Sequence, residues 1–367
     1  MTNTTNLHVS RLSMLAAVIM AATTPAQAVD FGAFGNIRYL SSNQDAATQG
    51  FMLGGFDLYA SQNIGEKTHV FVEYVMEGNG NSFVTDVERL VISRTFNDKF
   101  TLTAGRFHTP IGYWNNAYHH GALLQDTVNR PAFLDFEDGA NAILPTHTVG
   151  LLANGRFDQG RIQLSYDVAL GNGTSINTDT TSRELEINNI GDPNKSKAIA
   201  ARLGLEIENT GLKLGFSSVS NHIPESGTGM TYGIAPGGTL IAQTIFGLDA
   251  KFEKNKFDAL AEIYKFSDEN KTKTLTGKKK SATAYFAQFG YRLSDAWKVI
   301  YRHENVAFDS GDAYFKILQR EKYRQNVLAL RLDVDDSNAV KFEIDRQHNH
   351  SREDESRVIV QWDFLIP

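Results

Sequence analysis

Cysteine is absent from this chain of 367 residues. Its absence excludes disulfides, thiolate metal sites, covalent c-type haem attachment and thiol nucleophiles. After residue 28 the sequence also lacks any run of eighteen apolar residues, so it offers no transmembrane helix. Basic tracts are scarce, and the lysines at 278–280 form one short run. The net charge is −6, and acidic and basic residues are both spread along the chain. We therefore expect no nucleic-acid partner.

The first 28 residues have the pattern of a targeting segment. Arg11 supplies the positive charge, and 12–22 form an apolar core too short to span a bilayer as a helix. Residues 26–28 read Ala-Gln-Ala, which is a small-residue cleavage site. The segment resembles a bacterial Sec signal peptide. We predict that 1–28 are a signal peptide and that 29–367 form the mature, exported protein.

The mature sequence is rich in residues of strands and turns, with 30 glycines, 23 phenylalanines and 13 tyrosines in the whole chain. Apolar and polar residues alternate over segments of about ten residues, most clearly where Ile162 and Leu164 alternate with Gln163 and Ser165. A period of two is typical of a strand with one apolar and one polar face. The predicted strands are 30–40, 51–62, 68–77, 84–96, 100–107, 147–157, 161–170, 197–208, 211–220, 240–252, 257–267, 281–292, 297–306, 322–334, 339–348 and 356–366.

The connections between these strands alternate between short turns and longer loops along the whole chain. A soluble sandwich of two sheets would place loops of both kinds at both ends. An outer-membrane barrel has short turns at one rim, long loops at the other, an apolar outer face and a polar lumen. The alternation favours an all-β, transmembrane, antiparallel up-and-down β-barrel of about 16 strands.

The longest connection, 108–146, has no sustained helical period. A structureless insert of this length is uncommon in a compact domain and is usually functional. Counted from the N-terminus, it is the third outer loop of the predicted barrel. We interpret it as a loop folded back into the lumen.

The segment 86–116, DVERLVISRTFNDKFTLTAGRFHTPIGYWNN, resembles the stretch around the third loop of Gram-negative outer-membrane porins. Its GRFHTPIG portion is most similar to porins of the phosphate-selective type. The resemblance implies the outer membrane of a Gram-negative bacterium and a third loop that narrows a water-filled pore. It also implies contact with outer-membrane lipid and a homotrimer. The lipid-facing sides of 30–40 and 51–62 would make the trimer contact, because small residues there permit close approach (Ala33, Gly35, Gly54 and Ala60).

The loop carries four acids and one basic residue that are candidates for the pore constriction. Carboxylates at the narrowest point would favour cations, because the low-dielectric walls focus their field. Alternatively, these acids cap turns within the loop. The candidates are Asp126, Arg130, Asp135, Glu137 and Asp138.

Basic residues at inward-facing strand positions are candidates for the opposite wall of the pore. They would set a transverse field across the channel, or else form salt bridges with the wall acids, each worth little. The mixed signs argue against an anion filter. The candidates are Arg38, Arg94, Arg202, Arg292, Arg302 and Arg331.

Aromatic and histidine residues near the start of the loop suggest two further roles. Tyr113, Trp114 and Tyr118 could stack on a flat solute such as a sugar, or could pin the loop to the wall. His119 and His120, with His108 and His147, suggest a metal, but adjacent histidines on an irregular loop lack an established ligand spacing. We expect no metal and no cofactor.

The predicted function is a porin for ions and small hydrophilic solutes, with a weak cation preference. One alternative is a substrate-selective porin for phosphate, another anion or a sugar. A second is an outer-membrane barrel enzyme, and a third is a purely structural or adhesin barrel. The sequence shows no Gly-x-Ser-x-Gly elbow and no cluster resembling a triad, so we expect no enzymatic activity.

Overall fold

The computed structural model describes residues 29–44, 49–79, 82–119, 121–137, 139–178, 183–186, 191–192, 195–226 and 231–367. The signal peptide predicted at 1–28 lies outside these residues. The strands are β1 (Asp30–Ser42), β2 (Gly50–Ile64), β3 (Thr68–Asn79), β4 (Ser82–Asn97), β5 (Phe100–His108), β6 (His147–Gln159), β7 (Ile162–Asn172), β8 (Ile176–Asn177), β9 (Ala198–Ile207), β10 (Leu212–Ser226), β11 (Thr239–Lys254), β12 (Phe257–Asn270), β13 (Lys279–Arg292), β14 (Trp297–Phe308), β15 (Tyr323–Asp335), β16 (Asn338–Asn349) and β17 (Glu355–Ile366). The short helical elements are α2 (Trp114–Ala117), η1 (Ala122–Leu124), η2 (Ala132–Leu134) and α3 (Ala313–Ile317).

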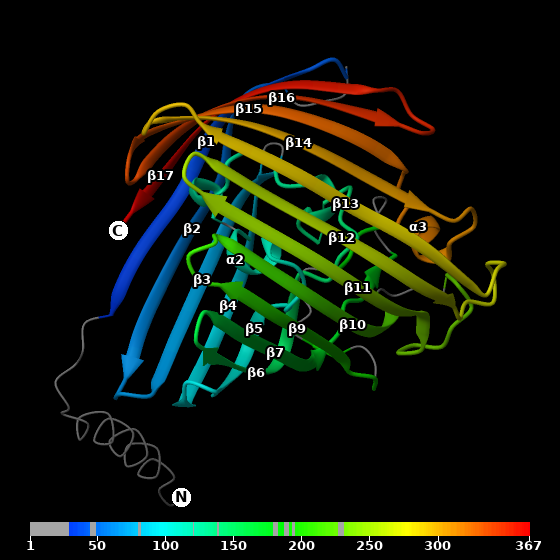
Figure 1. The fold of residues 1–367 in the computed structure, drawn as a ribbon. Helices are drawn as coiled ribbons and strands as arrows, with labels where there is room; N and C mark the ends of the chain where they lie inside the picture. The colour runs from blue at the N-terminus through cyan, green and yellow to red at the C-terminus, as the bar shows by residue number, and fades with distance from the viewer. Residues whose placement is uncertain are drawn as a thin grey trace, which may run out of the picture.

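The long strands form one antiparallel barrel, shown in Figure 1. Each pairs with its neighbours along the chain, and β1 pairs with β17 to close the ring. The two-residue β8 lies between β7 and β9 and pairs in parallel with the end of β10, so sixteen of the described strands make up the barrel. Closure gives every strand two partners, which removes the unpaired edge that lipid would not tolerate. The predicted architecture is confirmed.

All sixteen predicted strands are present, and most boundaries agree within two residues. The largest difference is at 211–220, because β10 continues to Ser226. Its last residues include Pro224, which reads as a strand breaker in the sequence. In the structure Pro224 lies at a register shift in the pairing with β11, where a missing N–H is tolerated.

Large apolar side chains cover the outer face of the barrel, as the alternation predicts. On β7 and β9, for example, Leu164, Val168 and Leu170 alternate with inward residues, and Ile199 and Leu203 are more than half exposed. Such a face suits lipid, where apolar surface carries no cost of hydration. No helix in the described part of the chain is long and apolar enough to cross a membrane.

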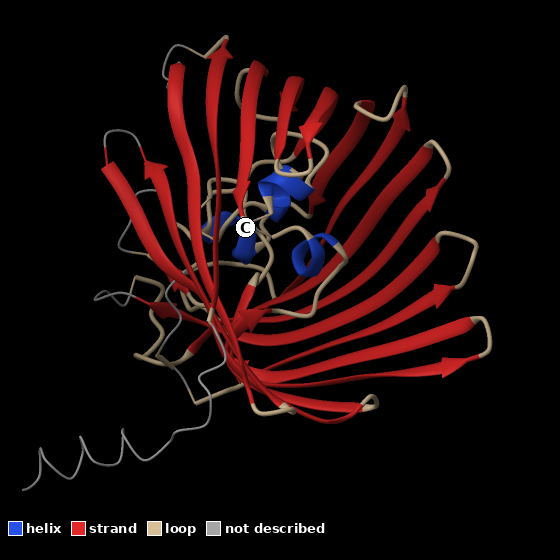
Figure 2. Ribbon diagram, turned by 90° about the vertical axis from the view of Figure 1, so that its left-hand side faces the viewer, coloured by secondary structure: helices blue, strands red, loops and turns tan. Residues whose placement is uncertain are grey.

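The interior holds the segment 109–146, which connects β5 to β6 and contains α2, η1 and η2. Figure 2 shows these helical elements surrounded by strands. Phe133 of η2 lies 6.0 Å from Tyr264 of β12 and 6.2 Å from Phe286 of β13, measured between ring centroids. The inner face of the barrel is therefore partly apolar where it meets the segment. Inward positions on β10 to β14 are partly apolar because they pack against the segment instead of facing water.

Candidate functional site

Three buried glutamates on alternate strands β12, β14 and β16 accept hydrogen bonds from backbone N–H groups of 109–146. Irregular backbone cannot satisfy these donors through secondary structure, so a wall carboxyl group serves as their acceptor. The contacts are Glu262 with Tyr113 N (2.8 Å) and Trp114 N (2.6 Å), Glu304 with Ala132 N (2.7 Å), and Glu343 with Val128 N (2.7 Å).

Three cations on β14, β15 and β16 bind the carbonyl side of the same segment. Two of them, Arg302 and Arg331, were predicted as basic residues of the pore wall. Their N–H groups donate hydrogen bonds to oxygen atoms of the segment, so these side chains anchor the segment to the wall. The contacts are Arg302 Nη1 with Thr127 Oγ1 (2.5 Å) and Asn129 O (3.0 Å), Arg302 Nη2 with Arg130 O (3.1 Å), Arg331 Nη1 with Leu123 O (2.6 Å) and Gln125 O (2.7 Å), and Lys341 Nζ with Ala122 O (2.5 Å).

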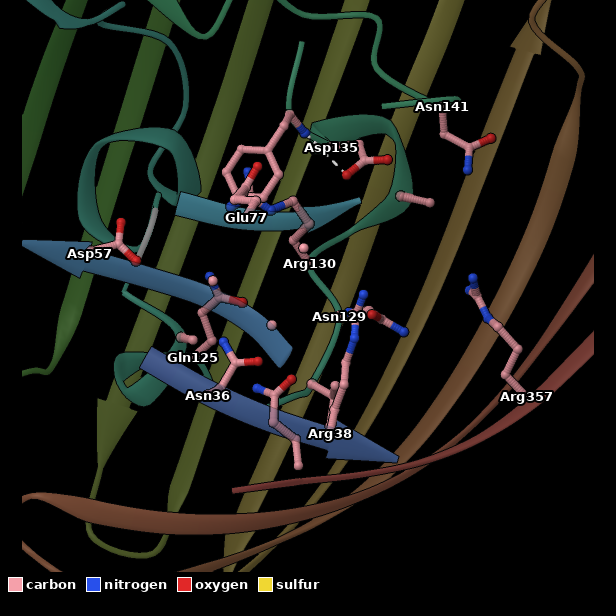
Figure 3. Close-up of a pocket in the computed structure, with 18 of the residues that line it drawn as sticks. Asn36, Arg38, Asp57, Glu77, Gln125, Asn129, Arg130, Asp135, Asn141 and Arg357 are labelled. Carbon is pink, nitrogen blue, oxygen red and sulfur yellow. Dashed lines mark hydrogen bonds between the residues drawn. The ribbon is translucent and has the colours of Figure 1, made fainter. Parts of the chain in front are cut away.

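A cavity of about 310 Å³ separates the segment from the opposite wall, which β1, β2, β3 and β17 form. Figure 3 shows its polar lining, to which both the loop and the strands of the wall contribute. We call this space the eyelet cavity. Its charged lining residues are the bases Arg38, Arg130 and Arg357 and the acids Asp57, Glu77 and Asp135.

Asp135 and Arg130 present the loop's charges to the eyelet cavity. The Arg130 guanidinium lies 3.5 Å from the centroid of the Phe136 ring and donates to His119 O at 2.5 Å. One Asp135 oxygen accepts from the backbone N–H of Phe136 at 3.1 Å, so the acid also caps its own turn. Burial raises the pKa of Asp135, and the positive charge of Arg130 partly opposes this rise.

A second cavity, of about 630 Å³, lies beside the short turns 294–296 and 335–336. We call it the vestibule. Asp126 lines it and pairs with Lys298 Nζ at 2.8 Å, and Lys298 also reaches Asp258 at 2.7 Å. Acids outnumber bases in the lining by seven to four: Asp126, Glu253, Asp258, Asp295, Asp333, Asp335 and Asp336 against Lys251, Arg292, Lys298 and Arg331.

The other charged candidates within the described residues lie away from the eyelet cavity. Glu137 is only 1% exposed and accepts from the backbone N–H groups of Thr146 (3.1 Å) and His147 (3.0 Å). Asp138 lies outside the described residues. The remaining bases are Arg94, which is exposed and donates to Thr68 Oγ1 (2.8 Å), Arg202, which pairs with Asp249 (2.6 Å), and Arg292, which lines the vestibule.

The aromatic candidates mainly hold α2 against the wall. Trp114 is 1% exposed and meets Tyr118 and Phe286 edge-on, at 5.2 and 5.6 Å between centroids. Its ring is therefore enclosed and not available for stacking on a solute. Tyr118 lines the vestibule and accepts a hydrogen bond from Lys251 Nζ at 2.9 Å.

Sequence reasoning missed Glu77 and Arg357 of the eyelet cavity. Both follow from strand alternation: Val358 is exposed on the outer face, so Arg357 faces inward, and Glu77 shares the side of the buried Glu73. Gly54 was expected on the lipid-facing side but lines the eyelet cavity. The register shift between β1 and β2 at Gly35 to Ile37 changes which residues of β2 face inward.

Comparison with known proteins supports the architecture. No family model and no curated protein matches the sequence. Among solved structures, the outer membrane channel DcaP of Acinetobacter baumannii has a TM-score of 0.57 at 10% identity, covering 92% of this chain and 97% of its own. OmpF of Salmonella typhi, in complex with daunomycin, has a TM-score of 0.55 at 11% identity, and the match covers 92% of this chain and 97% of OmpF.

The chain has the fold of a Gram-negative outer-membrane porin. A third neighbour is the trimer form of OmpT, an outer membrane protein of Vibrio cholerae, with a TM-score of 0.54 at 9% identity and coverage of 92% and 99%. These identities are low, so the likeness concerns the porin fold and not the solute. The charges of this chain's own cavities must therefore carry any argument about selectivity.

Proposed function

We propose that this chain is an outer-membrane porin that passes ions and small hydrophilic solutes by diffusion. The eyelet cavity carries the proposal, because a polar, charged space lies between the inner segment and the wall of a closed barrel. Charged side chains on both faces of a narrow passage would let hydrated solutes pass while excluding apolar ones. The constriction is then formed by Asp135 and Arg130 of the segment against Arg38 and Arg357 of the wall.

We further propose a weak cation preference. Charges are balanced in the eyelet cavity, three against three, whereas the vestibule has seven acids and four bases. An acidic vestibule raises the local concentration of cations and lowers that of anions before they reach the constriction. The arginines of the eyelet cavity support the alternative of an anion-selective porin, and the sign of the selectivity decides between the two.

The reversal potential across a planar bilayer, under a gradient of KCl, tests both proposals. We expect the conductance to rise in steps as single channels insert. We also expect the sign of the reversal potential to show that K⁺ passes more readily than Cl⁻. Asp135→Asn should shift the potential toward anion preference. Asp158→Asn is the matched control, because the Asp158 side chain is exposed near the end of β6 and lines neither cavity, so this variant should leave the potential unchanged. Absence of conductance from folded protein would refute the porin, and anion preference in the wild type would favour the alternative.

A channel is favoured over an enzyme by where the polar groups lie. Ser61 Oγ and His69 Nε2 lie 2.9 Å apart, a contact that resembles part of a catalytic dyad. These residues come from neighbouring strands β2 and β3, and neither lines the eyelet cavity or the vestibule. No described feature gives this pair a substrate site, so we propose no enzymatic role.

A homotrimer is proposed from the outer surface of the first and last strands. An apolar groove of about 470 Å³ crosses β1, β2, β16 and β17 and is lined mostly by Ile37, Tyr39, Phe51, Val340, Val360, Trp362 and Phe364. The trimer form of the OmpT neighbour supports the same stoichiometry. Light scattering in mild detergent should give the mass of three chains, and a monomer mass would refute the proposal.

A further inference from the structure

Three histidines and one glutamate converge where the inner segment meets the wall. The group comprises Glu88 of β4, His108 at the end of β5, His119 after α2 and His147 at the start of β6. Each can offer one ligand atom, and these atoms all lie within 4.8 Å of one another. Glu88, His119 and His147 are 2%, 3% and 4% exposed. In the sequence, His108, His119 and His147 suggested a metal, and the adjacent pair at 119–120 argued against one. The fold brings these three histidines together with Glu88 from four separate places.

The spacing of the ligand atoms fits a tetrahedral ion. The Nε2 atoms of all three histidines lie near Glu88 Oε1, at 3.4 Å from His108 and 3.0 Å from His119 and in a still closer contact from His147. Zinc bonds of about 2.0–2.1 Å in a tetrahedron place neighbouring ligand atoms about 3.3 Å apart. A bound ion would require His147 to move away from Glu88, and the ligand atoms, which now lie within 4.8 Å of one another, to approach this spacing.

The surroundings orient the ligands as in known metal centres. His147 Nδ1 lies 2.7 Å from Glu137 Oε2, and His119 Nδ1 lies 2.9 Å from Asn115 Oδ1. A carboxylate or amide oxygen that accepts from one ring nitrogen leaves the other nitrogen as the metal ligand.

Glu88 reaches the group because of a local distortion of the sheet. The pairing of β3 with β4 shifts between Glu73 and Tyr74, whose partners are Arg89 and Val87, so Glu88 is the extra residue of a β-bulge. A bulge changes the direction of a side chain, and bulges are frequent beside functional sites. Here the distortion directs an otherwise costly buried carboxylate at three imidazoles.

We propose that Glu88, His108, His119 and His147 bind one divalent zinc ion. Three imidazoles and a carboxylate, without cysteine, suit Zn²⁺, and four protein ligands make the closed set of a structural site. His119 belongs to the inner segment, whereas the other three ligands belong to the barrel wall. The ion would therefore fasten the beginning of the segment to β4, β5 and β6, opposite the anchors on β12 to β16. Glu137 and Asn115 are positioning residues.

The test is metal content after refolding of the full mature chain in detergent with excess Zn²⁺, followed by removal of free metal. We expect about one zinc ion per chain in the wild type, and its loss in both His119→Gln and His108→Gln. His348→Gln is the matched control, since His348 lies near the end of β16 with its side chain 70% exposed, and it should keep the full content. Circular dichroism must show intact strand structure in each variant before its content is compared.

Two further readouts separate binding from a purely structural role. Glu137→Gln should retain the ion but weaken its affinity about 10- to 100-fold, as loss of an outer partner does. Co²⁺ in place of zinc should give the intense visible absorption of four-coordinate cobalt. The proposal is overturned if folded wild type retains no metal, or if His119→Gln and His108→Gln retain as much as the wild type does. In that outcome His147 is simply a buried ion-pair partner of Glu88 and Glu137.

Discussion

Arg302 should be the strongest single anchor of the inner segment. Its side chain is fully buried, and so is its ion-pair partner Glu304, at 2.8 Å. Arg302→Met removes three hydrogen bonds to the segment and leaves the Glu304 carboxylate without its cation. Breaking a buried pair by removing one partner costs about 3–5 kcal/mol, mostly because the remaining charge is uncompensated. We expect a loss of this size in the free energy of unfolding.

The double variant Arg302→Met/Glu304→Gln separates charge from contact. Its glutamine can still accept from the Ala132 N–H, and neither charge of the Arg302–Glu304 pair remains. The double variant should therefore be more stable than Arg302→Met alone, with a coupling energy of about 0.5–3 kcal/mol. Urea unfolding of refolded protein, followed by tryptophan fluorescence, measures all three variants. Arg94→Met is the exposed control and should change stability by about 0.5 kcal/mol or less.

Two results would contradict this reasoning. A loss of less than about 1 kcal/mol in Arg302→Met would mean that the segment holds its position without this residue. A double variant no more stable than the single variant would mean that the lost contacts, and not the stranded Glu304 charge, determine the cost.

Three further outcomes are expected. The cation preference should weaken as the pH falls, because Asp135 becomes protonated and loses its negative charge. Burial raises the pKa of Asp135, so this weakening should begin at a higher pH than for an ordinary aspartate, whose pKa is about 3.9. The reversal potential of Asp135→Asn should lose this part of the pH dependence. The preference should also shrink between about 0.01 and 1 M salt, since the screening length falls from about 30 to 3 Å; a salt-independent potential would exclude an electrostatic origin. Trp114→Ala should cost about 3–5 kcal/mol in urea unfolding, whereas Trp362→Ala, 56% exposed on the outer face, should cost clearly less.

The barrel could be predicted from the sequence because its signal is local and repeated. Alternation within a strand decides which side chains face lipid, and the lengths of successive connections decide the topology. Both are visible without knowing any long-range contact. The missed end of β10 shows the limit, because only the pairing with β11 shows that the chain continues as a strand past Pro224.

The site was less predictable because its residues meet across the barrel. Arg302 reads as one more inward base, and nothing near it in sequence shows that it binds carbonyls about 170 residues away. Glu137 reads like Asp135, yet one is enclosed beside His147 while the other lines the eyelet cavity. Which of two similar acids faces water depends on the path of an irregular segment, and no periodic pattern records that path.

The glutamate anchors also constrain how the molecule can fold. Tyr113, Ala132 and Val128 bind carboxylates that lie 149, 172 and 215 residues further along the chain. Contacts of such long range form late, since the entropy of closing the loop must be lost before they contribute. These three contacts therefore cannot form while only the first seven strands are in place. The position of Tyr113, Val128 and Ala132, and with it the bore of the channel at these points, is set when β12, β14 and β16 join the barrel.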